Sequence, residues 1–332
     1  MSKCRFVWLL LPPLLISGCA HRGGRGDQER NQVISERYIH EYGYDLSRSE
    51  WESSEYSGKV VTKRRDGVTV VKSYGGGRLH GETLYTYPYS QIAHFVHDYQ
   101  HGTLTQSKVY NSRGVLQKET LYLSPVHIKQ TVWYASGTPM SEEEYQDDQP
   151  VEGKYYNTLN ELISSVSQGS GIRIVRDQYE QVMMQETLED GELVKRQTFH
   201  EHGVPHIVVT FSRGNFHGER KVFARSGEPI AVESYDQGLL HGPSSYYRNG
   251  TLYLQIHYDH GVKHGPELHF VEGNTQVENI SWVCGKKHGP SVLCIDGVPK
   301  KQWYYHDLPV TEGKYEALRV RAATILGSSQ ED

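Results

Sequence analysis

Hydrophobic and polar side chains alternate in short runs along much of the chain. In residues 251–258 one face carries Leu252, Leu254, Ile256 and Tyr258, and the other carries Thr251, Gln255 and His257. The run 204–211 has the same alternation with Ile207, Val209 and Phe211. A two-residue period over this length is typical of a β-strand with one buried face. Some runs, such as 138–145 with its three glutamates, break the alternation.

Dipeptides that favour tight turns separate many of these runs. They are Asp66-Gly67, Asp190-Gly191, Asn249-Gly250 and Asp296-Gly297. Asn, Asp and Gly tolerate the positive φ that a two-residue hairpin turn requires. The sequence therefore predicts strands that are joined in antiparallel pairs.

A second motif, Gly-x-x-His-Gly, recurs in phase with the strands, and its last four histidines follow one another every 23 or 24 residues. Its residues are Gly77, His80 and Gly81; Gly214, His217 and Gly218; Gly238, His241 and Gly242; Gly261, His264 and Gly265; and Gly285, His288 and Gly289. We interpret them as structural, with each motif forming a longer turn and each histidine ring bonding a carbonyl. Equivalent histidines of successive hairpins lie two strands apart, roughly 10 Å, and cannot share one metal ion.

The period predicts about twelve hairpin units between residues 43 and 315. The expected fold is all-β, an elongated meander of consecutive antiparallel β-hairpins. Residues 316–326 have helical character and are expected to cap the last strand edge, with a disordered tail up to residue 332. Residues 1–18 and 19–42 are expected to be a signal peptide and a lipid anchor with a flexible tether.

The string 241–250, His-Gly-Pro-Ser-Ser-Tyr-Tyr-Arg-Asn-Gly, resembles the MORN repeat, specifically its bacterial variant. The resemblance is strong over 203–313, fair over 67–153 and weak over 154–195. It implies an elongated antiparallel sheet of hairpins and a role as an interaction or membrane-associated scaffold. Some bacterial members of this family are antitoxin components, and the repeat carries no catalytic residue set to transfer.

The N-terminus has the features of a secretory signal that ends in a cysteine. Lys3 and Arg5 precede a short apolar run, residues 6–16, which is too short to span a bilayer. The string Leu-Ile-Ser-Gly-Cys at 15–19 resembles the bacterial lipoprotein lipobox. The alternative is a secreted protein that carries a cysteine here without lipid.

The lipobox resemblance implies cleavage after Gly18 and lipidation of Cys19. Two or more acyl chains anchor a protein stably, whereas a single chain binds a membrane only marginally. In the sorting pattern of lipoproteins, an Asp directly after the lipidated cysteine is a retention signal. Ala20 stands at that position here, which implies the outer membrane as the destination if the source has two membranes.

Composition excludes several classes of protein. The 332 residues carry 35 Lys and Arg against 40 Asp and Glu, a net charge of −5, which argues against a nucleic-acid partner. No apolar stretch reaches the ~18 residues of a membrane-spanning helix. The sequence has no nucleophile elbow, phosphate loop or His-Glu-x-x-His motif, so we expect neither catalysis nor a cofactor.

Two further groups of side chains are candidates for chemistry. His200, His202 and His206 are close in sequence and are a candidate metal site, although Gly203 interrupts them with a turn. Cys284 and Cys294 are expected either to form a disulfide or to remain two buried thiols.

Aromatic residues recur at one position of the repeat and are expected to stack between neighbouring strands. They are Trp51, Tyr74, Tyr99, Tyr122, Tyr145, Phe211, Tyr235, Tyr258, Trp282 and Tyr305. A single sheet cannot cover both of its faces, so the residues between these rings are candidates for binding. The expected function is a membrane-anchored scaffold for a protein or cell-envelope partner. The alternative is a membrane-lipid-binding or antitoxin-like inhibitor repeat protein.

Overall fold

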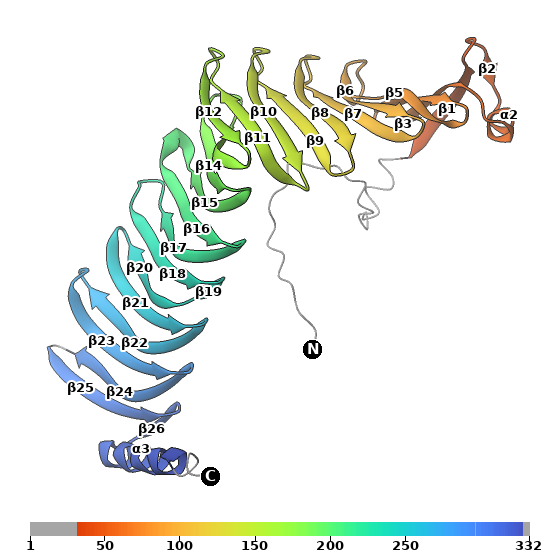
Figure 1. The fold of residues 1–332 in the computed structure, drawn as a ribbon. Coiled ribbons are helices and arrows are strands. Elements are labelled where there is room, and N and C mark those ends of the chain that lie inside the picture. Colours follow the sequence, from red (N-terminus) through yellow and green to blue (C-terminus); the bar gives the residue numbers. More distant parts are fainter. Residues whose placement is uncertain (1–31, 296, 328–332) are drawn as a thin grey trace. The chain divides into compact units, whose positions relative to one another are not determined.

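The structure, a computed structural model, describes residues 32–295 and 297–327. The chain forms two units, which divide between Leu116 and Gln117. Both units are built from consecutive antiparallel strands, and the second unit ends in a helix (Figure 1). The predicted all-β meander of hairpins with a short C-terminal helix is therefore confirmed.

In the first unit a small helix interrupts the strands near the start. The elements are β1 (Val33–His40), β2 (Asp45–Leu46), α2 (Arg48–Ser53), β3 (Gly58–Arg64), β4 (Thr69–Gly75), β5 (Arg78–Thr86), β6 (Ala93–Gln100) and β7 (Thr103–Tyr110). Strand β1 pairs with both β2 and β3, and each strand from β3 to β6 pairs with the next.

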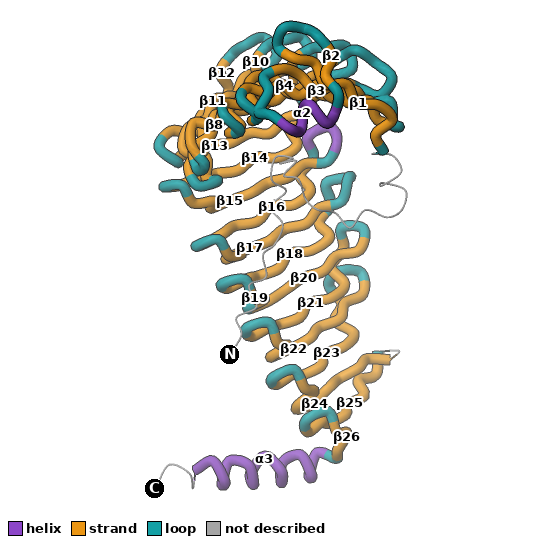
Figure 2. The backbone as a smooth tube through the Cα atoms, turned by 90° about the vertical axis from the view of Figure 1, so that its right-hand side faces the viewer, coloured by secondary structure: helices purple, strands orange, loops and turns teal. Residues whose placement is uncertain are grey.

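The second unit continues the same plan with more hairpins. After β8 (Leu116–Ser124), which begins at the division, its strands are β9 (His127–Trp133), β10 (Pro139–Gln146), β11 (Gln149–Tyr156), β12 (Leu162–Ser167), β13 (Ser170–Arg176), β14 (Val182–Glu189), β15 (Glu192–Phe199), β16 (Pro205–Ser212), β17 (Asn215–Phe223), β18 (Pro229–Asp236), β19 (Leu239–Leu240), β20 (Gly242–Arg248), β21 (Thr251–Asp259), β22 (Val262–Val271), β23 (Thr275–Val283), β24 (Lys286–Ile295), β25 (Val298–Tyr305) and β26 (Leu308–Val310). A short 3-10 turn, Glu201–Gly203, precedes β16. Figure 2 shows these hairpins following one another along the unit.

Turns join the strands at Asp66-Gly67, Asp190-Gly191 and Asn249-Gly250, as predicted, and also at the first glycine of the Gly-x-x-His-Gly motif. Asp296 lies outside the described residues. Asn249 and Gly250 have φ of 50° and 72°, and His260 and Gly261 have φ of 46° and 84°. The flanking residues pair directly, Arg248 with Thr251 and Asp259 with Val262. Two residues of positive φ match the right-handed twist of the strands on either side.

The His-Gly part of the motif is a β-bulge, whereas the sequence predicted a turn there. Between the pairs Ile256–Glu267 and Tyr258–Lys263, three residues of β22, including His264 and Gly265, face one residue of β21. Gly265 has a φ of 94°, which residues with a Cβ rarely adopt. A bulge of this kind bends the strand and increases its twist.

One face of the single sheet in the second unit is buried along its middle. The residues on this line, which we call the central row, include both charged or polar and apolar side chains. They are Arg173, Glu186, Arg196, Val209, Arg220, Glu233, Ser244, Ile256, Glu267, Ile280 and Ser291. Val209, Ile256 and Ile280 are 5–7% exposed. The core of this unit is therefore a line along a sheet face, with a cluster of Tyr155, Val166 and Leu188 near its start.

The C-terminal helix α3 (Glu312–Gly327) follows β26 (Figures 1 and 2). It begins four residues before the helical segment that the sequence predicted. Tyr315 attaches it to the last hairpin, because its buried ring lies 4.8 Å from Trp303 and 5.3 Å from His288. The tail from residue 328 lies outside the described residues.

The start of the repeat region differs from its sequence prediction. Strand β1 lies within residues 19–42, which were assigned to the anchor and tether, so strand pairing begins at Val33 and not at residue 43. Trp51 lies in α2 and not in a strand. Ser47 caps this helix and exchanges hydrogen bonds with Glu50, a local capping signal that the search for repeats missed.

Candidate functional site

Aromatic side chains, joined by two lysines in the later hairpins, lie beside the central row on the same sheet face. This second line, the aromatic row, consists of Phe211, Phe216, Tyr235, Tyr258, Lys263, Trp282, Lys287 and Tyr304. Tyr304 occupies the last position, where the sequence predicted Tyr305, because Tyr304 is the residue that pairs with Gly289. The bulge glycines Gly218, Gly242, Gly265 and Gly289 each pair with an aromatic residue of the next strand.

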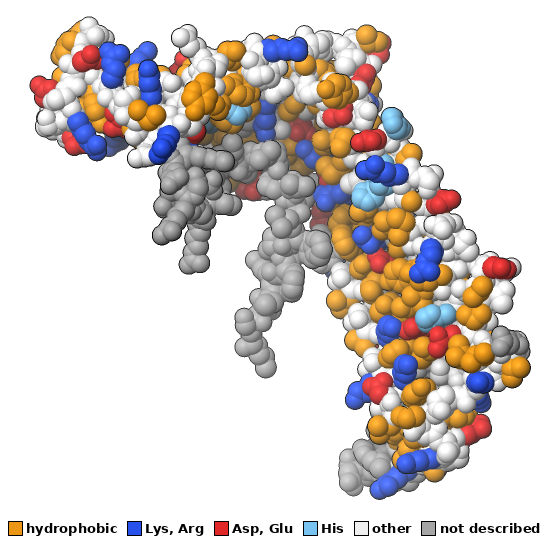
Figure 3. All heavy atoms as spheres, turned by 180° about the vertical axis from the view of Figure 1, so that it is seen from behind, with side chains coloured by type: hydrophobic (Ala, Val, Ile, Leu, Met, Phe, Trp, Pro, Cys, Tyr) orange, Lys and Arg blue, Asp and Glu red, His pale blue; other side chains and the backbone are white. Residues whose placement is uncertain are grey.

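Cation–π contacts connect members of the aromatic row. The Lys263 Nζ lies 4.6 Å from the ring centre of Trp282, and the Lys287 Nζ lies 5.3 Å from that of Tyr304. These side chains are half-buried, so their outer edges remain accessible. Figure 3 shows hydrophobic side chains along the hairpins of the second unit, with charged side chains between them. Such a face offers both apolar area and fixed charges to a ligand.

A buried network of charged side chains lies under the first hairpins of the second unit. The Arg173 Nε lies 2.7 Å from Oε1 of Glu143, and its Nη1 lies 2.9 Å from Oε2 of Glu186. Arg196 bonds the other oxygen of Glu186. The side chains of Glu143 and Glu186 are only 3% and 8% exposed, so each charge depends on its partner.

Burial alone would raise the pKa of the Glu143 carboxyl, but Arg173 and the hydroxyls of Tyr145 and Tyr155 outweigh it and hold that pKa below its ordinary value. Both tyrosine hydroxyls donate to Glu143, at 2.5 and 2.9 Å. Burial, with the carboxylate as the next cause, raises the pKa of both tyrosines. The lowered pKa keeps Glu143 ionised at neutral pH, with Arg173 as its cationic partner.

The network continues with smaller groups on later hairpins. Arg220 bonds Glu233 at 2.6 Å, and Lys263 bonds Glu267 at 2.6 Å. His269 lies 2.9 Å from the other oxygen of Glu267. Each buried carboxylate thus has a cation beside it, and these fixed charges order the face on which the aromatic row lies.

The histidines of the Gly-x-x-His-Gly motif lie along the side of the sheet where the strands end. Each contacts the end of the following hairpin, and we call each such contact point an edge. The imidazole centroids are 4.9 Å apart for His80–His101, 5.0 Å for His241–His260 and 4.7 Å for His288–His306. The sequence predicted that each of these rings would bond a carbonyl, but here each ring lies against a second imidazole. The two remaining motif histidines, His217 and His264, instead contact Asp236 and the backbone N–H of Cys284.

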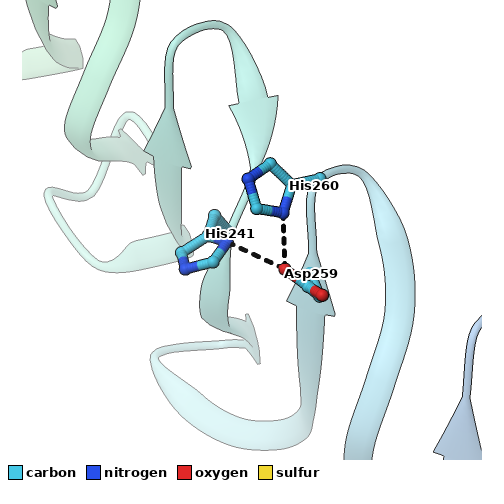
Figure 4. Close-up of side chains that lie close together, drawn as sticks. All are labelled: His241, Asp259 and His260. Atoms are coloured by element: carbon cyan, nitrogen blue, oxygen red, sulfur yellow. Dashed lines mark hydrogen bonds and ion pairs between the residues drawn. The ribbon is translucent and has the colours of Figure 1, made fainter. Parts of the chain in front are cut away.

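One such edge brings together three side chains that could hold a metal ion (Figure 4). The Nδ1 of His260 lies 2.6 Å from Oδ1 of Asp259, and the Nδ1 of His241 lies 3.4 Å from the same oxygen. The hydrogen bond with His260, and then the charges of His241 and His264, keep the pKa of Asp259 below its ordinary value. All three side chains are exposed, so a solute can reach them.

Residues 240–260 match the family described as the MORN repeat variant. This segment is therefore a MORN-type repeat. The matched MORN-type repeat comprises the hairpin of β20 and β21 and contains all three residues of Figure 4. No curated protein matches the chain. In the part of the chain that the structure describes, no helix is long and apolar enough to cross a bilayer.

The turn between β15 and β16 separates the residues of the predicted metal site. The rings of His200 and His206 are 4.3 Å apart, but His202 lies in the 3-10 turn with a φ of 66°. The Nε2 of His200 lies 3.0 Å from the carbonyl oxygen of Phe223. These three histidines do not come together as a set of ligands, because the turn at Gly203 directs the chain away between them.

Cys284 and Cys294 are free thiols, so the structure corrects the predicted disulfide. Cys284 lies in the turn before β24, and Cys294 lies near the other end of that strand. From Lys286 to Cys294 the extended strand covers about 25 Å, so the two sulfur atoms are too far apart to bond. Cys284 is exposed and Cys294 half-buried, which also differs from the expected pair of buried thiols.

Cys19 and Gly18, the predicted lipidation and cleavage residues, lie outside the described residues. The roles of Asp259 and His260 were not predicted, because equivalent motif histidines are too far apart to share an ion and the contact instead involves the following turn. A signal was nevertheless available, since a second His-Gly dipeptide follows the motif at 101–102 and at 260–261. The pairing of Arg173 with Glu143 carried no such signal, because the repeat is degenerate in that region.

Proposed function

We propose that this chain is a binding scaffold without catalysis, held on a membrane by lipid at Cys19, which presents the aromatic row to a protein or cell-envelope partner. The repeat fold fits a binding role. The observation that carries the proposal is the run of accessible aromatic and basic side chains, from Phe211 to Tyr304, on one sheet face. Aromatic and cationic groups are enriched among the residues that dominate binding energy at interfaces.

The buried charges support this assignment. Buried ion pairs contribute little net stability, because desolvation offsets their attraction. Here they fix the positions of side chains on the face that carries the aromatic row. A face with fixed charges and rigid rings loses little conformational entropy when a partner binds.

The anchor rests on the lipobox string 15–19. If the source has two membranes, the outer membrane is the destination we propose. Replacing the thiol by Cys19→Ser should move the full-length protein from the membrane fraction to the soluble fraction, since lipid can no longer be attached. A Cys19→Ser protein that stays with the membranes would refute the anchor.

The binding role is tested by purifying the full-length anchored protein with its partner. Trp282→Ala combined with Tyr258→Ala should reduce partner recovery at least about tenfold, because truncation of a central aromatic contact often removes 2 kcal/mol or more. Lys221→Ala is the matched control, since that side chain is exposed and lies on the opposite sheet face. Equal recovery from all the proteins would contradict the proposal.

A lipid surface is the second candidate, because Lys263 and Lys287 flank Trp282 in the aromatic row. Basic side chains beside an amphipathic ring suit anionic headgroups at a membrane interface. For this test the full-length protein is anchored in vesicles of neutral lipid, and anionic vesicles are added as the ligand. If a lipid surface is the partner, the anchored protein should bind the anionic vesicles, and the double variant Lys263→Ala with Lys287→Ala should not. Recovery of a protein partner without any vesicle binding favours the first candidate.

A further inference from the structure

The edge formed by His241, Asp259 and His260 differs from the other edges in its set of donor atoms. Among residues 32–295 and 297–327, these three form the only group of at least three metal-ligating side chains whose donor atoms all lie within 4.8 Å of one another. They lie at the ends of neighbouring strands, with His260 in the turn after β21. His241 joins β19 to β20, its N–H donates to the Ser234 carbonyl, and Asp259 ends β21.

The chain contains its own comparison series for this position. For each of the five motif histidines, the two equivalent residues are the last residue of the next strand and the first residue of the turn after it. They are Gln100 and His101 for His80, Asp236 and Gln237 for His217, Asp259 and His260 for His241, Val283 and Cys284 for His264, and Tyr305 and His306 for His288. Each motif histidine contacts at least one residue of its pair. Two edges have two imidazoles and no carboxylate at this position, and one has a carboxylate and a single imidazole. Only the edge at His241 has all three groups.

The separations suit one small divalent ion. Ligands bound about 2.0–2.1 Å from a tetrahedral Zn²⁺ lie roughly 3.3 Å apart. The Asp259 oxygen is 3.4 Å from Nδ1 of His241 and 2.6 Å from Nδ1 of His260, so small side-chain rotations would admit an ion between them. The His260 side chain is 67% exposed and the Asp259 side chain 52%, which leaves room for these rotations.

We propose that His241, Asp259 and His260 bind one divalent transition-metal ion of the Zn²⁺ class. Two imidazoles and a carboxylate are a donor set that such ions prefer, whereas Mg²⁺ and Ca²⁺ prefer oxygen ligands. Three protein ligands leave a fourth position for water or for a donor from a partner. The proposal rests on this side-chain geometry and is independent of the proposed scaffold function.

The test is a titration of the full-length protein, in detergent and without a polyhistidine tag, with Zn²⁺ after removal of bound metal by a chelator. We expect one ion per chain with micromolar affinity. Loss of an outer-shell partner costs about 10- to 100-fold in metal affinity, so loss of a ligand should cost at least about tenfold. His260→Gln and Asp259→Asn should both show this loss. Gln237, with a φ of 46°, occupies the equivalent turn position, so the fold accepts Gln there.

Three further variants keep the outcome decisive. His101→Gln and Cys284→Ser alter other edges and should leave the affinity unchanged, which excludes binding by scattered histidines or by the thiol. Gln237→His should add a second ion, because it places an imidazole beside the existing contact of His217 with Asp236 at 3.2 Å. Absence of Zn²⁺ binding, wild-type affinity in both His260→Gln and Asp259→Asn, or an unchanged count in Gln237→His would each overturn the proposal.

Discussion

Arg173 binds the carboxylate of Glu143 although the two residues belong to strands three positions apart in the sheet, β13 and β10. Between them, Gly153 of β11 pairs with Glu143, and Val166 of β12 pairs with Gly153. Because Gly153 has no side chain, the position beside Glu143 on β11 is left open on this face. A glycine in the sheet thus accompanies a buried ion pair between distant strands.

Replacing Arg173 should destabilise the first hairpins of the second unit. Arg173→Met leaves Glu143 and one oxygen of Glu186 without their cation, and loss of one partner of a buried pair costs about 3–5 kcal/mol. Repeat arrays open locally, so the effect is best measured by native-state hydrogen exchange of the amides in β10 to β15. Arg48→Met removes an exposed pair with Glu52 in α2 and should leave those amides unchanged.

The same region should lose stability in acid. The pKa of Glu143 is lowered in the folded chain, so its contribution is fully present above the ordinary glutamate value of 4.5 and is lost as the pH falls below it. The protection factors of the amides in β10 to β15, which compare their exchange with the intrinsic rate at the same pH, should therefore fall below about pH 4.5. Glu143→Gln should flatten this dependence, and an unaltered acid profile in that variant would assign the effect to other carboxylates.

Gly153 should not tolerate a methyl group. A Cβ there would lie 2.6 Å from the hydroxyl of Tyr155, whose ring is 1% exposed and whose hydroxyl donates to Glu143. We expect Gly153→Ala to cost about 1–3 kcal/mol, typical of overpacking in a core. The matched control is Gly313→Ala in α3, where nothing lies within 4 Å, and it should be neutral or stabilising. Equal denaturation midpoints for the two variants would contradict the packing described.

Buried histidines in the first unit should make it less stable at mildly acidic pH. Burial lowers the pKa of His97, whose Nδ1 is buried with no hydrogen-bond partner among the described residues. A lowered folded pKa means that stability is full above about 6.5 and falls as the pH drops below that value. His97→Phe should lose less stability than the wild type between pH 7.5 and 5.5 in urea denaturation. Burial also lowers the pKa of His94, so part of the dependence should remain.

The sequence predicted the hairpins because their signals are local. Turn dipeptides and bulge glycines need positive φ whatever surrounds them. Pro139, Pro205 and Pro229 each begin a strand, where a missing N–H is tolerated. Contacts between hairpins depend on strand register, which a bulge shifts. For this reason the sequence could not predict that His260 approaches His241. It also could not predict that Tyr304, and not Tyr305, lies in the aromatic row. Helix α2 was missed because its signal is a cap and not a repeat.

The most direct test of the account places a photo-crosslinking amino acid at single positions of the full-length anchored protein in its own cells. At Tyr258 it lies in the aromatic row, and at Lys221 it lies on the opposite sheet face. We predict a discrete crosslinked product from Tyr258 that is absent from Lys221 and is lost when Trp282→Ala is added. Crosslinking from Lys221 alone, or equally from both positions, would contradict the claim that the aromatic row is the binding face.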